Sequence, residues 1–182
     1  VGYDTLEETS GIVAMNNGNE WKESLSEGEE GTVITAKTPF YATMGGQCAD
    51  TGIIVCGESE FQVEDTVKLP GDRIGHVGKV VKGSLKTGDV ATLKVNEANH
   101  SDTCKNHSAT HLLQKALQSV LGGHVEQAGS FVNGDRLRFD FSHSSAMTKE
   151  EICRVEKLVN EKIGESLAVV TKVMSIEEAK KT

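Results

Sequence analysis

The chain has 182 residues, and its 27 acidic and 19 basic side chains give a formal net charge of −8 at pH 7. Hydrophobic residues make up 37% and charged residues 25%, which is typical of a folded globular domain and excludes a disordered chain. No run of about 18 apolar residues occurs, and no secretory signal opens the chain. The four dispersed cysteines predict reduced thiols and therefore a cytoplasmic location.

The balance of acidic and basic residues changes near residue 100, and we predict a domain boundary there. Residues 1–100 hold 16 acids and 8 bases, whereas residues 101–182 hold 11 of each. An acidic first domain does not suit a phosphate-binding surface. Any contact with nucleic acid is therefore expected to be local and mostly in the second domain, 101–182.

The first domain is predicted to be a small β-barrel or sandwich. Short segments rich in Val, Ile and Thr alternate with Gly, Pro and Asn turns, a pattern typical of antiparallel strands. The expected strands are 11–15, 31–38, 52–56, 60–68, 75–82 and 89–95. Residues 24–30 are acidic and polar, which predicts a solvated surface loop.

The second domain mixes helices with a hairpin, so the predicted fold class is α+β: a small barrel, then helices packed on a mostly antiparallel sheet. Apolar side chains recur with helical spacing over 107–121, with Asn106 as the expected N-cap. Gly134-Asp135 separates two strand patterns, 124–133 and 136–142, which predicts a hairpin. Thr148 is expected to cap a second helix, and a strand over 167–173 is expected to precede a last helix that opens at Ser175.

His107 and His111 are the sharpest chemical signal. Residues four apart on a helix lie on one face, so both imidazoles can reach one metal ion. The pair lies on the opposite side of the helix from the apolar stripe, which distinguishes it from core residues but not from a solvated face. Adding Cys104 would make a possible ligand trio, although an N-cap at Asn106 would place Cys104 outside the helix.

Two further segments are weaker signals. Paired glycines at Gly45-Gly46, followed by Gln47, allow another backbone or a ligand to approach closely, although the residues alone favour an ordinary tight loop. Strand alternation over 137–141 puts Arg138 and Asp140 on the face opposite three apolar side chains.

Several segments together resemble the alanyl-tRNA synthetases, in an order and spacing that cover nearly the whole chain. The resemblance rests on residues 2–7 (GYDTLE), 38–52 (TPFYATMGGQCADTG), 106–113 (NHSATHLL), 121–130 (LGGHVEQAGS) and 137–143 (LRFDFSH). It implies a β-barrel followed by the N-terminal part of an editing domain. The aminoacylation domain, with its ATP, Mg²⁺ and alanine sites, would lie upstream.

The resemblance also implies an activity and its residues. In this family the editing region hydrolyses serine or glycine wrongly attached to tRNA(Ala), whose acceptor end is then the expected partner. His107 and His111 would be zinc ligands, and Gln127 matches a position of the editing pocket, so we assign it a catalytic role. Substrate binding is assigned to the loop and strand residues Gly45, Gly46, Gln47, Arg138 and Asp140.

The zinc site is expected to be incomplete in this chain. The family completes it with a Cys-x-x-x-His motif, and the chain ends at Thr182 without one. We therefore expect a fragment of an alanine–tRNA ligase that is inactive alone. Two alternatives stay open: a free-standing trans-editing hydrolase, and a non-catalytic tRNA-docking module. The sequence leaves the oligomeric state, the metal and the preferred misacylated amino acid undetermined.

Overall fold

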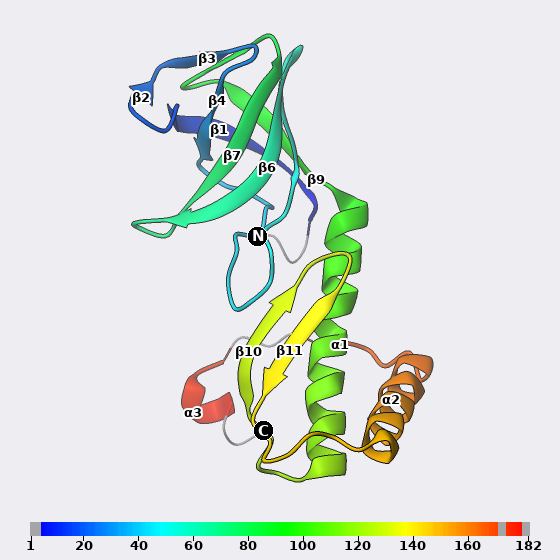
Figure 1. The fold of residues 1–182 in the computed structure, drawn as a ribbon. Helices are drawn as coiled ribbons and strands as arrows, with labels where there is room; N and C mark the ends of the chain where they lie inside the picture. The colour runs from blue at the N-terminus through cyan, green and yellow to red at the C-terminus, as the bar shows by residue number, and fades with distance from the viewer. Residues whose placement is uncertain (1–4, 171–173, 180–182) are drawn as a thin grey trace. The chain divides into compact units, whose positions relative to one another are not determined.

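The computed structural model describes residues 5–170 and 174–179. Its strands are β1 (Glu7–Asn16), β2 (Trp21–Lys22), β3 (Ser24–Ser26), β4 (Glu30–Thr35), β5 (Gly52–Cys56), β6 (Ser59–Leu69), β7 (Arg73–Lys82), β8 (Ser84–Lys86), β9 (Val90–Val95), β10 (Gln127–Val132) and β11 (Leu137–Phe141). Its helices are α1 (Glu97–Leu121), α2 (Lys149–Gly164) and α3 (Ile176–Ala179), as Figure 1 shows. The chain forms two compact units, Val1–His107 with Gln127–Phe141, and Ser108–Glu126 with Ser142–Thr182.

The predicted α+β class and its barrel are confirmed. Six antiparallel strands follow the order β1-β4-β7-β6-β5-β9, and pairing of β1 with β9 closes the barrel. Closure leaves the barrel without open sheet edges. The predicted boundary at residue 100 falls within the first turns of α1 and stays a prediction, as does the arrangement of the second domain as an editing domain.

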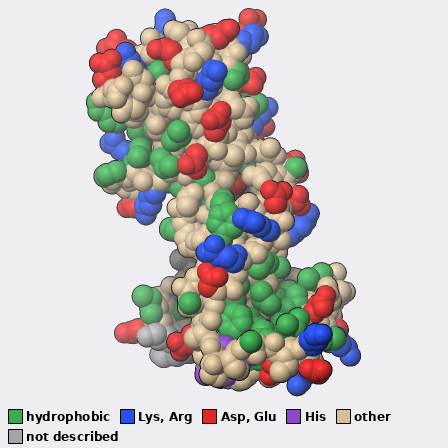
Figure 2. Space-filling model, viewed as in Figure 1, with side chains coloured by type: hydrophobic (Ala, Val, Ile, Leu, Met, Phe, Trp, Pro, Cys, Tyr) green, Lys and Arg blue, Asp and Glu red, His purple; other side chains and the backbone are tan. Residues whose placement is uncertain are grey.

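Inward-pointing apolar side chains, most of them aliphatic, fill the barrel, as alternation along the strands predicts. Each buried Val, Leu, Ile or Phe contributes about 1.5–3 kcal/mol relative to an exposed position. The buried core cluster consists of Ile12, Met15, Leu25, Val33, Phe40, Ile54, Phe61, Val63, Val80, Leu85, Ala91, Leu93 and Val95. On the outside, Figure 2 shows acidic side chains interspersed with Lys and Arg over the barrel surface.

One barrel prediction is wrong: residues 24–30 are not all loop. The short strand β3 pairs with β8, with Leu25 opposite Leu85. Both leucines are fully buried in the core. A single apolar residue among polar and charged neighbours gives no two-residue periodicity, so the sequence pattern could not reveal this strand.

The hairpin β10–β11 forms as predicted, and it belongs to the same compact unit as the barrel. The charged face of β11 is confirmed, because Arg138 and Asp140 are exposed while Leu137, Phe139 and Phe141 are half-buried. Phe139 and Phe141 stack with ring centroids 6.2 Å apart.

Elements of the second unit follow local sequence signals with one exception. Thr148 caps α2 in a capping box with Glu151, as predicted. Residues 167–170 are not in a strand, contrary to prediction, and residues 171–173 of that predicted strand lie outside the described residues. Helix α3 begins at Ile176, directly after the predicted opening residue Ser175. Among the described residues, no helix has the length and apolar character needed to cross a membrane.

Candidate functional site

The glycine-rich loop, residues 44–48, is held against β10. Met44 and Gln47 close a tight turn through reciprocal backbone hydrogen bonds of 3.3 and 3.1 Å. The Val132 N–H donates to the Gly46 carbonyl, and the Cys48 N–H donates to the Val132 carbonyl, both at 2.8 Å. The loop therefore extends the hairpin with a short parallel bridge between Gln47 and Val132.

Close approach to the hairpin requires a glycine at position 46. Its φ of 86° lies in the left-handed region, and an added Cβ would stand 2.6 Å from the Ser130 carbonyl oxygen. Gly45 also has a positive φ, of 61°, but an added Cβ there would meet nothing within 4 Å. Substitutions at the two positions therefore distinguish the cost of backbone strain, which both incur, from the cost of a steric clash, which only Gly46 incurs.

We expect Gly46→Ala to destabilise the 182-residue chain by about 2 kcal/mol more than Gly45→Ala. Both substitutions incur left-handed strain, and only Gly46→Ala forces the loop away from the Ser130 backbone. The measurement is urea unfolding of both variants beside the parent chain. Equal losses of unfolding free energy would show that the contact with Ser130 is unimportant.

Gln47 connects the loop to helix α1. Its side chain is buried, and its Oε1 accepts a hydrogen bond from His107 Nδ1 at 2.5 Å. This bond fixes the tautomer of His107 with the proton on Nδ1 and the lone pair on Nε2. An imidazole oriented through one nitrogen by an oxygen acceptor is typical of metal-binding histidines.

Gln127 lies beside the same loop. Its Nε2 donates to Ser130 Oγ at 3.1 Å, and that hydroxyl donates to the Gly45 carbonyl at 3.4 Å. Both side chains are polar and at least partly accessible. The predicted residues Gly45, Gly46, Gln47, Gln127 and His107 are therefore gathered in one unit, and we call them the loop–hairpin cluster.

Arg138 and Asp140 form an ion pair with each other, from Arg138 Nε to Asp140 Oδ2 at 3.1 Å. Their side chains are 65% and 47% exposed, so the pair contributes little to stability. They lie on β11 opposite Phe131 and Gly129. Their predicted part in substrate binding stays a prediction.

The predicted N-cap at Asn106 is wrong. Helix α1 begins ten residues earlier, at Glu97, and Asn106 lies inside it. The Asn106 amide donates instead to the carbonyls of Asn133 and Gly134, at 2.8 and 3.2 Å. Asn106 thus fastens the hairpin turn to the helix, a role that helix signals in the sequence do not reveal.

Both histidines lie in α1, four residues apart, as predicted; His107 is half-buried and His111 is exposed. The longer helix includes Cys104, but the thiol of Cys104 pairs with His100 rather than with this pair. Within residues 5–170 and 174–179, no group of three or more His, Cys, Asp or Glu side chains is arranged to hold a metal ion.

Sequence reasoning missed three contributors in this unit: Ser130, Asp50 and His100. Asp50 is buried and accepts hydrogen bonds from the Tyr41 N–H at 2.9 Å and from His100 Nδ1 at 2.8 Å. Ser130 connects Gln127 to the loop, because its hydroxyl accepts from Gln127 and donates to the Gly45 carbonyl. The four-residue spacing of His100 and Cys104 was visible in the sequence, but their connection to Asp50 depends on the fold.

Comparison with known proteins gives strong matches. The family model of tRNA synthetases class II (A) matches residues 1–99. Alanine--tRNA ligase 1 of Lachnoclostridium phytofermentans is 56% identical over 182 residues, all of this chain and 21% of that protein. The alanine--tRNA ligases of Methylobacillus flagellatus and Neisseria gonorrhoeae are 45% and 46% identical over 181 residues. The chain spans about a fifth of the length of these relatives.

Proposed function

The chain belongs to the class II (A) tRNA synthetase family, and from this premise we propose that it is the part of an alanine–tRNA ligase that hydrolyses mischarged tRNA(Ala). The observation that carries the proposal is the loop–hairpin cluster, in which the glycine-rich loop, Gln127 and His107 come together. The whole ligase would attach alanine to tRNA(Ala) using ATP and Mg²⁺ at a site in another domain. The four free thiols support a reducing, cytoplasmic setting.

The residues fit part of a zinc site. Gln47 holds the Nδ1–H of His107, so the Nε2 lone pair is the one suited to a metal. His111 stands one helical turn further along α1 and supplies a second imidazole. A bound zinc ion would lower the pKa of its water to about 7. Two imidazoles do not complete a zinc site, so we propose that the remaining ligands come from elsewhere in the ligase, in the Cys-x-x-x-His motif that the resemblance implies.

Polar groups of the cluster suit the recognition of a small hydroxylated amino acid. The Gln127 amide and the Ser130 hydroxyl provide hydrogen-bond donors and acceptors beside the loop. The space next to Gly45 is open, because an added Cβ there would meet nothing within 4 Å. A site that hydrogen-bonds a hydroxyl rejects the analogue without it strongly, because its polar groups are then left unpaired. Alanine lacks the serine hydroxyl, so correctly charged Ala-tRNA(Ala) would not be hydrolysed.

The experiment is deacylation of Ser-tRNA(Ala) by the full-length ligase, with Gln127→Ala compared with the parent enzyme. We expect the variant to be slower by about tenfold, the equivalent of one hydrogen bond of about 1.4 kcal/mol, with zinc content unchanged. Gln114→Ala, on α1, is the matched control and should retain the parent rate. A parent ligase that releases no serine would contradict the proposal, as would zinc loss on Gln127→Ala.

A further inference from the structure

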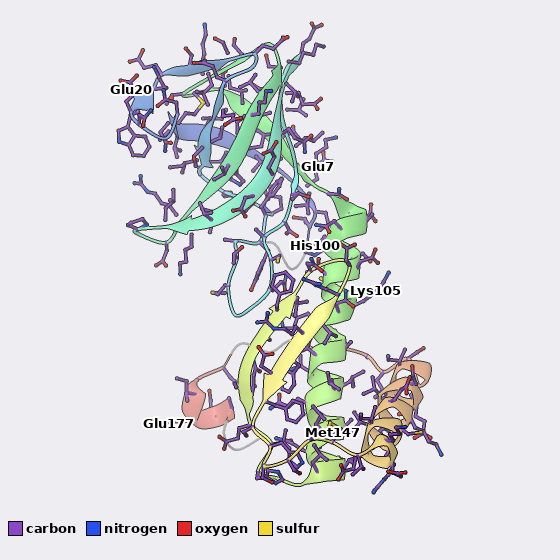
Figure 3. All side chains as sticks on the ribbon, viewed as in Figure 1. Glu7, Glu20, His100, Lys105, Met147 and Glu177 are labelled. Atoms are coloured by element: carbon purple, nitrogen blue, oxygen red, sulfur yellow. The ribbon has the colours of Figure 1, made fainter. Side chains whose placement is uncertain are left out.

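A thiol, an imidazole and a carboxylate form a chain of two hydrogen-bond contacts near the start of α1, and none of them belongs to the loop–hairpin cluster. Cys104 Sγ is 3.5 Å from His100 Nε2, and His100 Nδ1 is 2.8 Å from Asp50 Oδ1. His100 and Cys104 lie four residues apart on α1, and Asp50 comes from the loop before β5. Figure 3 shows His100 on the first turns of the helix.

The carboxylate fixes the orientation and tautomer of the imidazole. The side chain of Asp50 is only 3% exposed, and the Tyr41 N–H occupies its second oxygen at 2.9 Å. A carboxylate accepts hydrogen bonds, so the proton of neutral His100 sits on Nδ1. The Nε2 lone pair is therefore directed at the Cys104 thiol. A nucleophile, a base and a group that orients the base are the parts of an activated nucleophile.

Cys104 is exposed to solvent, so a reagent can reach it. Burial of part of the side chain and the negative charge of Asp50 raise the pKa of the Cys104 thiol. The resting thiol therefore holds its proton more firmly than an ordinary cysteine does. Without assistance Cys104 would react more slowly, because the thiolate is the nucleophile. Activation must come from transfer of the proton to His100 during the reaction.

We propose that Cys104 is a thiol nucleophile with His100 as its general base, and that it forms mixed disulfides with small-molecule disulfides of the glutathione class. The Cys104 sulfur attacks one sulfur of the reagent while its proton passes to His100 Nε2. A new S–S bond forms, the old one breaks, and the leaving thiolate takes the proton from the imidazolium. Between these two proton transfers, the Asp50 carboxylate stabilises the positive charge on His100.

The test measures mixed-disulfide formation at each cysteine of the reduced 182-residue chain, treated with oxidised glutathione at pH 7 and mapped by peptide mass spectrometry. Cys153 is the internal control: it is exposed on α2 and, within the described residues, has no side-chain hydrogen bond. General-base assistance predicts that Cys104 reacts about tenfold faster than Cys153 or more.

The variant His100→Asn isolates the base. The amide N–H of the asparagine takes the place of His100 Nδ1–H and keeps the hydrogen bond to Asp50. The basic nitrogen Nε2, which faces the Cys104 thiol, is removed. We expect Cys104 to become slower than Cys153 in this variant. The proposal is overturned if Cys104 is no faster than Cys153 in the parent chain, a comparison that needs no variant, or if His100→Asn keeps the advantage of Cys104.

Discussion

Lowering the pH from 7 to 4 is expected to remove about 3 kcal/mol of barrel stability through His76 alone. The imidazole is fully buried in the barrel, where Nδ1 donates to the Val33 carbonyl and Nε2 accepts from the Thr38 hydroxyl, both at 2.8 Å. Burial lowers the pKa of His76 from 6.5 to about 4, although the hydrogen bond to Val33 opposes this shift.

The sign follows from the two pKa values. In the unfolded chain His76 takes up a proton below about pH 6.5, while the folded barrel keeps it neutral until about pH 4. The contribution to stability is therefore complete above pH 6.5 and is lost as the pH falls from 6.5 to 4. The measurement is the free energy of urea unfolding of the 182-residue chain at pH values across this window.

Other groups also titrate in this range, so the control is the variant His76→Phe. Phenylalanine keeps a ring against Phe40, whose centroid lies 5.1 Å from that of His76, and removes the titrating group. We expect the variant to be less stable at pH 7 but to lose less stability on acidification. Parallel pH profiles for the two proteins would refute the assignment to His76.

Barrel strands were predictable because their residues carry the signal locally. β5 has the predicted bounds, and the ends of β6, β7 and β9 lie within two residues of prediction. Regular alternation and glycine turns were sufficient there. β1 is longer than predicted at its N-terminal end, because pairing of Glu7–Gly11 with β9 is a long-range contact that closes the barrel.

The start of α1 was not predictable from apolar spacing. Residues 97–106 are mostly polar, and tertiary hydrogen bonds hold them instead: His100 to Asp50, and Asn106 to the hairpin turn. The Asn96 side chain accepts from the Asn99 N–H at 3.2 Å, as an N-cap does. The cap signal was present ten residues before the predicted one, but no apolar stripe followed it directly.

Contacts of the candidate site illustrate the same limit. Resemblance singled out Gln47 and His107 separately, but their hydrogen bond joins residues 60 positions apart in the chain. The close approach of Gly46 to Ser130 likewise depends on how the hairpin packs. Residue types were visible in the sequence, whereas their partners required the fold.

Replacing His107 or His111 with alanine in the full-length ligase is expected to slow deacylation of Ser-tRNA(Ala) by about 100-fold or more. Each imidazole would hold one corner of the zinc site, so its loss should lower metal occupancy. Gln47→Ala should weaken zinc binding about 10- to 100-fold, because it releases the Nδ1–H of His107. Alanine charging should survive all three changes, since we propose that its site lies in another domain.

The measurement that tests this account most directly follows serine release from Ser-tRNA(Ala), zinc content and alanine charging together in the full-length ligase. Parent enzyme, His107→Ala and His111→Ala are compared with His124→Ala, which removes an exposed histidine elsewhere in the chain. The account predicts that only the first two variants lose deacylation and zinc, with charging intact. Histidine variants that lose alanine charging but keep deacylation would contradict it.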